Sequence, residues 1–340
     1  MNPIPRRRLG RSDLSVPVVG FGGAPLGDLY ALVDEASAID TVTAAIDRGI
    51  ELIDTSPLYG HGLSELRIGA ALRRRPGRKV LISSKVGRVT EPFTLKEAGS
   101  GYVGGLAHAL RFDYSHDGAM RSLEQSMLRL GVDSIDIALI HDVDVWTHGA
   151  ANVECRFAEA MEGAYRALER LRTTGAIKAI GVGVNEAEMC ERFARSGDFD
   201  VMLLAGRYSL LEQPALARFL PLAVERGIGV MLGGVFNSGI LATGPVRNAK
   251  YNYGPAPPDV MEKVRRLDQV CRQFGVPLHR AALHFALGHP AVGCVILGAV
   301  SAAEVAHQVD ALGPEVPSGL WAALKDGGLL ARDAPTPGMR

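Results

Sequence analysis

The chain repeats one local pattern eight times: a short run rich in β-branched residues, a turn, and a segment with helical spacing of its apolar residues. Such runs are typical of parallel strands that are buried on both faces. Strands that alternate with helices of 10 to 17 residues predict βαβ units and a parallel sheet. Eight units favour a closed (β/α)8 barrel of the α/β class, a TIM barrel, over an open doubly wound sheet.

The expected strands are Val18–Gly22, Glu51–Asp54, Val80–Lys85, Asp136–His141, Ala179–Val184, Val201–Ala205, Gly229–Leu232 and Val292–Leu297. The expected helices are 36–48, 64–73, 117–130, 157–173, 186–195, 215–226, 259–274 and 301–310. Since barrels of this kind run well past 200 residues as one domain, we expect residues 1–340 to form a single domain.

Four segments depart from the alternation. Residues 6–17 predict a small N-terminal β-hairpin that plugs the N-terminal face of the barrel. Residues 88–116 are rich in glycine and irregular, which indicates a long loop at the C-terminal face, either a substrate-binding lid or a solvated insertion. Residues 277–287 add a helical stretch, and the chain after Gly313 is expected to be partly ordered surface.

The charge and cysteine content exclude several classes of protein. Thirty-seven basic and 37 acidic residues give zero formal net charge, which argues against a nucleic-acid or polybasic membrane surface. No apolar run approaches the length of a membrane-spanning helix, and the first residues lack the apolar region of a secretory signal. Four widely spaced cysteines form no metal-binding pattern, so we expect reduced thiols and a cytoplasmic protein.

Four polar residues lie at or just after the ends of three of the expected strands, where the active sites of such barrels lie. They are Asp54, Tyr59, Lys85 and His141. Lys85 is one of only seven lysines and ends an apolar strand, so its ammonium group needs a partner, which Asp54 can supply. A cation beside Tyr59 is expected to lower the pKa of its phenol, which would make it a proton donor and acceptor near neutral pH. Each residue also has a structural alternative: a buried ion pair, a loop aromatic and a core-edge histidine.

The segments DTSPLYGHGLSE (54–65), SSKVG (83–87), LIHD (139–142) and GVGVN (181–185) resemble the aldo-keto reductase family. The resemblance runs from the hairpin to the region of Gly298. It implies a (β/α)8 barrel that uses a nicotinamide cofactor without a Rossmann fold, which agrees with the lack of a strand–GxGxxG–helix motif. It also implies that Tyr59 is the acid/base, that Lys85 and Asp54 tune its pKa, and that His141 orients the substrate oxygen.

The resemblance extends to the cofactor site, although several positions depart from the family pattern. Asn185 matches the residue that binds the nicotinamide carboxamide, but Val184 replaces the usual preceding serine and Ala205 the usual glutamine. The segment 233–241 resembles the loop around the pyrophosphate, and it also suits a plain glycine-rich turn. The cofactor-binding residues implied are Gly22, Asp54, Asn185, Tyr208, Phe236, Ser238, Gly239, Leu241, Gly298, Glu304 and Gln308.

Two of these positions bear on the choice of cofactor. Members that use NADP place a lysine and an arginine on the 2′-phosphate where this chain has Gly298 and Glu304. An acid repels a 2′-phosphate and suits a free 2′-hydroxyl, so we expect a preference for NAD. NADP is the alternative cofactor, with Arg247 or Lys250 to supply the missing base.

Further segments resemble a bacterial branch of sugar dehydrogenases that includes L-fucose or D-threo-aldose 1-dehydrogenases and pyridoxal 4-dehydrogenase. These segments include GFGGAPLGDLY (20–30), FDYSHDGAMRSLEQS (112–126) and AGRYSLLEQ (205–213). The resemblance implies oxidation of an aldose at C1 to the lactone. The substrate-binding residues expected are Leu26, Tyr30, Trp146 and His148, together with segment 88–116.

Three other functions are open to a chain of this kind. The same four residues serve an aldehyde or ketone reductase, including one that acts on pyridoxal-type substrates. A non-catalytic nicotinamide-binding subunit would not need all four. A metal-dependent hydrolase built on His141, Asp142 and Asp54 has too few converging histidines, so we expect no metal. The expected partner is a small molecule, with neither nucleic acid nor membrane, and the expected state is a monomer or homodimer.

Overall fold

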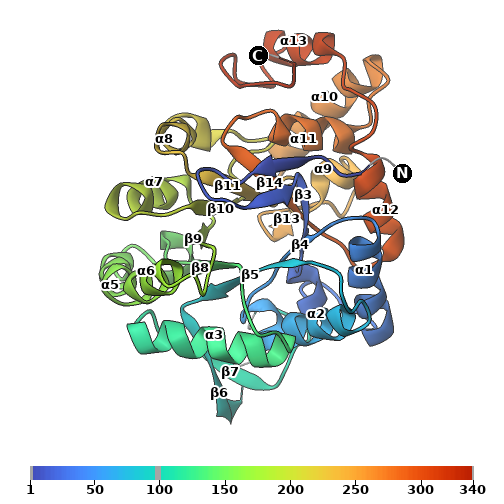
Figure 1. The fold of residues 1–340 in the computed structure, drawn as a ribbon. Coiled ribbons are helices and arrows are strands. Elements are labelled where there is room, and N and C mark those ends of the chain that lie inside the picture. The colour runs from blue at the N-terminus through green and yellow to red at the C-terminus, as the bar shows by residue number, and fades with distance from the viewer. Residues whose placement is uncertain (1–2, 96–100, 339–340) are drawn as a thin grey trace.

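The computed structural model describes residues 3–95 and 101–338, and its centre is a closed barrel of eight parallel strands (Figure 1). Around the barrel the strands lie in the order β10-β11-β14-β3-β4-β5-β8-β9, so chain order is kept. Their bounds are β3 Val19–Gly22, β4 Leu52–Asp54, β5 Leu81–Val86, β8 Ile137–His141, β9 Ala179–Val184, β10 Val201–Ala205, β11 Gly229–Gly233 and β14 Val292–Gly298. The predicted (β/α)8 fold is confirmed, with strand ends within one residue of those expected.

Helices surround the barrel at the expected places (Figure 1). The main ones are α1 Glu35–Asp47, α2 Leu63–Arg73, α3 His116–Leu130, α5 Val153–Glu159, α6 Tyr165–Thr173, α7 Ala187–Ser196, α8 Phe219–Arg226, α10 Pro258–Gln273, α11 Leu278–Leu287 and α12 Ala302–Asp310. Side-chain caps explain where several begin. Asp34, Ser115 and Ser301 each accept a hydrogen bond from a backbone N–H in the first turn of the helix that follows.

The helix predicted over 157–173 contains a π-helical turn at Ala160–Ala164 between α5 and α6. At this turn the Ala164 N–H donates to the carbonyl oxygen of Tyr114 at 2.8 Å, outside the helix. Gly163 allows the approach, because a Cβ there would lie 2.5 Å from that same oxygen. The extra residue in the turn therefore lets the helix pack directly against the loop that precedes α3.

Apolar side chains fill the barrel and the space between its outer wall and the helices. The inner cluster contains Leu52, Ile137, Leu139, Ala179, Val201, Leu203, Met231, Cys294 and Ile296. Leu9, Leu14 and Val16 of the N-terminal hairpin belong to this cluster. The hairpin pairs β1 (Arg6–Arg8) with β2 (Ser15–Pro17), so the predicted plug is confirmed. Its apolar residues close the N-terminal end of the barrel.

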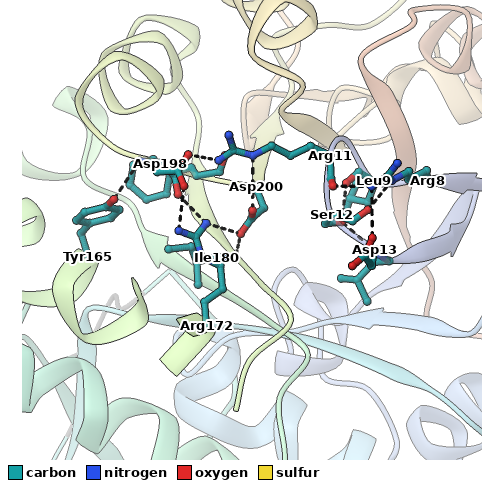
Figure 2. Close-up of polar contacts among 12 residues, drawn as sticks. Arg8, Leu9, Arg11, Ser12, Asp13, Tyr165, Arg172, Ile180, Asp198 and Asp200 are labelled. Atoms are coloured by element: carbon teal, nitrogen blue, oxygen red, sulfur yellow. Dashed lines mark hydrogen bonds and ion pairs between the residues drawn. The ribbon is translucent and has the colours of Figure 1, made fainter. Parts of the chain in front are cut away.

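Charged residues fasten the hairpin to the barrel (Figure 2). The guanidinium of Arg11, at the tip of the hairpin, reaches the carboxylate of Asp198 and lies 3.8 Å from that of Asp200. Arg172 of α6 binds Asp200 at 2.9 Å from the other side, and Asp200 also accepts from the Ile180 N–H at 3.0 Å. The network therefore links the hairpin, α6, β9 and the loop before β10.

The segment 88–116 is not an irregular loop as the sequence analysis expects. Strand β6 (Arg88–Leu95) pairs antiparallel with β7 (His108–Phe112), and this hairpin projects beyond α3 at the bottom of Figure 1. Its connecting chain returns to the barrel, where the Leu106 N–H donates to the Gly60 carbonyl at 2.9 Å. The glycines that indicate an irregular loop lie in this connection, and residues 96–100 are outside the described part.

The end of the chain is also more ordered than expected. Residues Ser318–Asp326 form α13, which buries Leu320, Trp321 and Leu324 against the apolar layer outside the barrel. Three apolar residues spaced as one helical face explain the packing. Within residues 3–95 and 101–338, no helix is long and apolar enough to cross a membrane. The same residues contain no cluster of His, Cys, Asp and Glu suited to a metal ion.

Candidate active site

The neighbouring strands β4 and β5 bring Asp54 and Lys85 together at the C-terminal rim of the barrel. Lys85 Nζ lies 2.7 Å from Asp54 Oδ2 and donates to the Thr55 carbonyl at 2.8 Å. The other carboxylate oxygen, Oδ1, accepts from the Ser83 hydroxyl at 2.7 Å. The Lys85 side chain is only 1% exposed, so the carboxylate compensates a charge that burial would otherwise make very costly.

Tyr59 lies over this ion pair at the start of a short 3₁₀ turn, Tyr59–Gly62. The next two residues, Gly60 and His61, have φ of 62° and 55°, which turns the chain sharply and directs the phenol toward the rim. Lys85 Nζ is 4.9 Å from the centre of the Tyr59 ring. The Tyr59 and His141 rings meet edge to face, with centres 6.1 Å apart. All four predicted catalytic residues therefore meet at one place.

The electrostatics of Tyr59 differ from the expectation that Lys85 lowers its pKa. Burial, followed by the negative charge of Asp54, raises the pKa of Tyr59 well above its ordinary value of 10.0. Asp54 neutralises the Lys85 ammonium group at 2.7 Å. The phenol thus faces a neutral pair in an apolar setting, and its protonated form is favoured.

His141, at the end of β8, is held by two residues that the sequence analysis misses as site residues. Its Nδ1 lies 3.1 Å from the Ser56 hydroxyl and 3.2 Å from Nη1 of Arg88. Burial and the positive charges of Arg88 and Lys85 keep the pKa of His141 well below its ordinary 6.5. The imidazole is therefore neutral at physiological pH. Ser56 lies inside the quoted segment 54–65, whereas only the tertiary structure brings Arg88 to His141.

A cavity of about 750 Å³ opens above these residues at the C-terminal end of the barrel. Twelve of the predicted residues line it: Gly22, Tyr30, Asp54, Tyr59, Trp146, Asn185, Phe236, Ser238, Gly239, Gly298, Glu304 and Gln308. They come from the ends of barrel strands, from the segments that follow those strands, and from α12. Lys85 and His141 are buried beside Asp54 and Tyr59 at one end of the cavity.

Four predicted binding residues do not line the cavity. Leu26 and Leu241 are fully buried in the apolar layer, and Tyr208 packs its ring 5.0 Å from that of Phe285. His148 binds the Tyr114 hydroxyl through Nε2 at 2.9 Å. The sequence segments that contain these residues do reach the site, but the direction of each side chain is set by packing that a motif does not encode.

Two residues that line the cavity, Tyr253 and Arg207, were not among those predicted, and Tyr102 of the predicted segment 88–116 and Lys250 contact aromatic rings of the site. Tyr253, from the chain before the short strand β13 (Gly254–Pro255), lines the cavity, and Tyr102 places its ring centre 6.5 Å from that of Tyr59. Lys250 stacks over the Tyr30 ring at 3.7 Å. Aromatic rings thus surround the catalytic end. Arg207 also lines the cavity and binds Asn252 at 3.1 Å.

The far end of the cavity, at the start of α12, suits the adenosine half of a dinucleotide. Gln308 donates from Nε2 to the Gly298 carbonyl at 2.8 Å, while its Oε1 is buried and accepts no hydrogen bond from any described residue. A ligand donor would satisfy this oxygen. Glu304 accepts from the Val300 N–H at 3.0 Å and also faces the cavity. Among the described lining residues there is no lysine, and Arg207 is the one arginine.

Comparison with known proteins agrees with this geometry. The sequence profile of the aldo/keto reductase family matches residues 18–325. The chain belongs to this family. It is 40% identical to pyridoxal 4-dehydrogenase of Microbacterium luteolum, covering 96% of this chain and 98% of that protein. It is 35% identical to D-threo-aldose 1-dehydrogenase of a Pseudomonas species, covering 96% and 97%.

Solved structures with the same fold include a glycerol dehydrogenase from Gluconobacter oxydans. Its TM-score is 0.71 at 22% identity, with 98% of this chain and 97% of that one covered. An aldo-keto reductase from Bacillus halodurans gives a TM-score of 0.70 at 24% identity, with 93% of each chain covered. This aldo-keto reductase is therefore an oxidoreductase of the branch that contains aldose and pyridoxal dehydrogenases, and its family uses NAD(P)(H).

Proposed function

We propose that this aldo-keto reductase is an NAD-preferring dehydrogenase that oxidises an aldose at C1 to the lactone. The observation that carries the proposal is the phenol of Tyr59 beside a neutral His141 at one end of a 750 Å³ cavity. The resemblance to D-threo-aldose 1-dehydrogenase supports the choice of an aldose.

The chain's own residues have clear roles in such a reaction. The bound dinucleotide supplies the hydride acceptor. In the oxidation, the ionised Tyr59 accepts the proton of the C1 hydroxyl, and His141 donates a hydrogen bond to the same oxygen. Asp54 and Lys85 form a buried ion pair beside the Tyr59 ring. Asn185, Gln308 and the glycine-rich wall around Gly239 are the groups that hold the dinucleotide.

The preference for NAD rests on the charges at the far end of the cavity. Glu304 is the charged residue on the first turn of α12, and Gly298 offers no side chain. Arg247 is exposed and Lys250 stacks on Tyr30, and neither lines the cavity. A 2′-phosphate there would face a carboxylate without a matching cation, whereas a ribose hydroxyl can donate to it.

Pyridoxal is a second candidate substrate. The rings of Tyr30, Trp146 and Tyr253 line the cavity, and aromatic side chains stack on a planar heteroaromatic ring as well as on the C–H face of a sugar. The relative that acts on pyridoxal by name is 40% identical to this chain. An aldose ring and the internal hemiacetal of pyridoxal both present a carbon that carries a hydroxyl and a ring oxygen. The same residues can therefore serve either.

The test is a panel of aldoses, including L-fucose and D-threo-aldoses, together with pyridoxal, with NADH formation followed by absorbance for wild type and Tyr59→Phe. We expect turnover of at least one hemiacetal substrate, and a loss of about 10³-fold in kcat in the variant. NADH affinity, measured by fluorescence titration, should stay unchanged. Full activity of Tyr59→Phe would remove the assigned role, and tighter binding of NADPH than of NADH would contradict the cofactor preference.

A further inference from the structure

The hydrogen bonds around His141 determine which of its two ring nitrogens carries the proton. Nη1 of Arg88 lies 3.2 Å from His141 Nδ1. A guanidinium group has only N–H donors and stays protonated, so Nδ1 must accept. The Ser56 hydroxyl, 3.1 Å from the same nitrogen, can donate to it as well. On the other side of the ring, the carboxylate oxygen Oδ1 of Asp142 lies 3.3 Å from Nε2, and its charge favours a proton there. The two atoms form no hydrogen bond, so an Nε2–H stays available to a substrate oxygen. Both sides of the ring therefore favour a proton on Nε2.

Arg88 is itself held firmly in place. Its Nη2 forms an ion pair with Asp142 Oδ2 at 2.8 Å, and its guanidinium carbon lies 4.5 Å from the centre of the Phe112 ring. Phe112 is the register partner of Arg88 between β6 and β7. The side chain of Arg88 is only 8% exposed, so it lies beneath the surface of the site. The hairpin β6–β7 thus begins with a buried cation directed at the active-site histidine.

We propose that Arg88 is a positioning residue that holds His141 as the neutral Nε2–H tautomer, so that Nε2 is the ring atom that donates to the substrate oxygen. The role of that oxygen rests on the proposed function. The tautomer itself rests on the hydrogen-bond geometry alone. The segment that the sequence predicts as a loop thereby contributes to the reaction through its first residue.

The charges around His141 show what the loss of Arg88 would do. Six titratable or charged groups face the ring or its immediate partners: Tyr59 from the 3₁₀ turn, Lys85 of β5, Asp54 of β4, Arg88 of β6, Tyr114 from the loop before α3, and Asp142 after β8. Arg88 neutralises Asp142. Without it, that carboxylate is left buried and unpaired beside Nε2, which favours a charged imidazolium.

The test compares wild type with Arg88→Met, which keeps the length of the side chain and removes its donors and charge. Protein labelled with ¹⁵N-histidine reports the protonation of each ring nitrogen by NMR, and a His141→Gln spectrum identifies the His141 signals. In wild type we expect an unprotonated Nδ1, a protonated Nε2 and no titration between about pH 5 and 8. In Arg88→Met we expect His141 to titrate within that range.

Kinetics provide the second measurement. Arg88→Met should lower kcat by about 100-fold, the effect of losing one oriented donor, and should add an acidic limb to the pH profile of kcat/KM. Arg88→Lys keeps the positive charge and N–H donors, so it should retain the tautomer and recover part of kcat. Arg111→Met is the matched control, since Arg111 is on β7 of the same hairpin and pairs with Glu91 and Asp113. It should leave the His141 signals unchanged.

Two results would overturn the proposal: a protonated Nδ1 in wild type, or a His141 in Arg88→Met with the wild-type tautomer and no titration. If Arg88→Met does not fold, the wild-type spectrum and the Arg88→Lys variant still test the proposal. An Arg88→Lys protein whose His141 shows mixed tautomers, and whose kcat is about 100-fold below that of wild type, would contradict the charge argument. A protein that turns over no hemiacetal would contradict the proposed function while leaving the tautomer measurement intact.

Discussion

Lys85 and Tyr59 show how far reasoning at the scale of a single residue reaches. A lysine that ends an apolar strand in a lysine-poor chain points to a buried ion pair, and Asp54 is its partner at 2.7 Å. The same reasoning gives the wrong direction for the pKa of Tyr59. The pKa of the phenol depends on all nearby charges and on its exposure to solvent. The carboxylate of Asp54, which pairs with Lys85, cancels the positive charge of that lysine.

The raised pKa of Tyr59 has a consequence for the pH dependence of the reaction. Oxidation of an alcohol needs a group that accepts a proton, and the protonated phenol cannot accept one. As pH rises, the fraction of phenolate grows, so kcat/KM for oxidation should increase steadily. Because the pKa lies above its ordinary value of 10.0, we expect no plateau below that pH.

Initial rates of oxidation and reduction with the best substrate, measured between about pH 6 and 10, check this expectation. Reduction uses the protonated phenol and should show no loss over the same range from Tyr59. A plateau of the oxidation rate near pH 7 would mean that the phenol ionises far more readily than its surroundings in this structure allow.

At the scale of elements, the N-terminal hairpin and the hairpin β6–β7 illustrate different limits of prediction. The first places three apolar residues at and after a tight turn, and the side chains of Leu9, Leu14 and Val16 fill the end of the barrel. None of the described residues of the second hairpin belongs to the apolar cluster inside the barrel. Its strands pair with each other outside the barrel, and Arg88 and Phe112 fix it to the site by a cation–aromatic contact.

The charged network at the first hairpin offers a graded test of stability (Figure 2). Arg172 and Asp200 have side chains that are 19% and 10% exposed, whereas Arg11 and Asp198 are 42% and 60% exposed. Removing Arg172 leaves a nearly buried carboxylate without its closest cation, so Arg172→Ala should cost about 2 kcal/mol. Arg11→Ala breaks a pair open to solvent and should cost less than about 1 kcal/mol.

Urea unfolding of the two variants and of Asp200→Asn measures this difference. The amide of Asn needs no counter-ion, so Arg172→Ala in the Asp200→Asn background should cost less than in wild type. Equal losses for Arg11→Ala and Arg172→Ala would show that burial does not govern the strength of this network.

For the whole molecule, the lowered pKa values of buried histidines couple stability to acid. The pKa of His141 lies well below 6.5, and those of His279 and His289 are lowered to about 4, in each case mainly by burial. Between pH 6.5 and 4 the unfolded chain binds protons at these positions and the folded protein does not. The free energy of unfolding therefore increases with pH in this window, and the stability is complete above it.

Urea midpoints at about pH 7, 6 and 5 should fall in that order, with a shallower dependence in His289→Gln. His289 is suited to the comparison because it is buried against the Tyr208 ring and lies outside the cavity. An unchanged slope in this variant would assign the acid sensitivity to other groups.

The sequence by itself determined the barrel, the order of its strands, the plug and the four candidate catalytic residues. These follow from the period of apolar residues and from short motifs at strand ends, which are local signals. Only the tertiary structure decided the raised pKa of Tyr59, the contact of Arg88 with His141, and the burial of Leu26, Tyr208 and Leu241 away from the cavity. Such properties depend on which atoms meet through space, and no short window of sequence contains both partners.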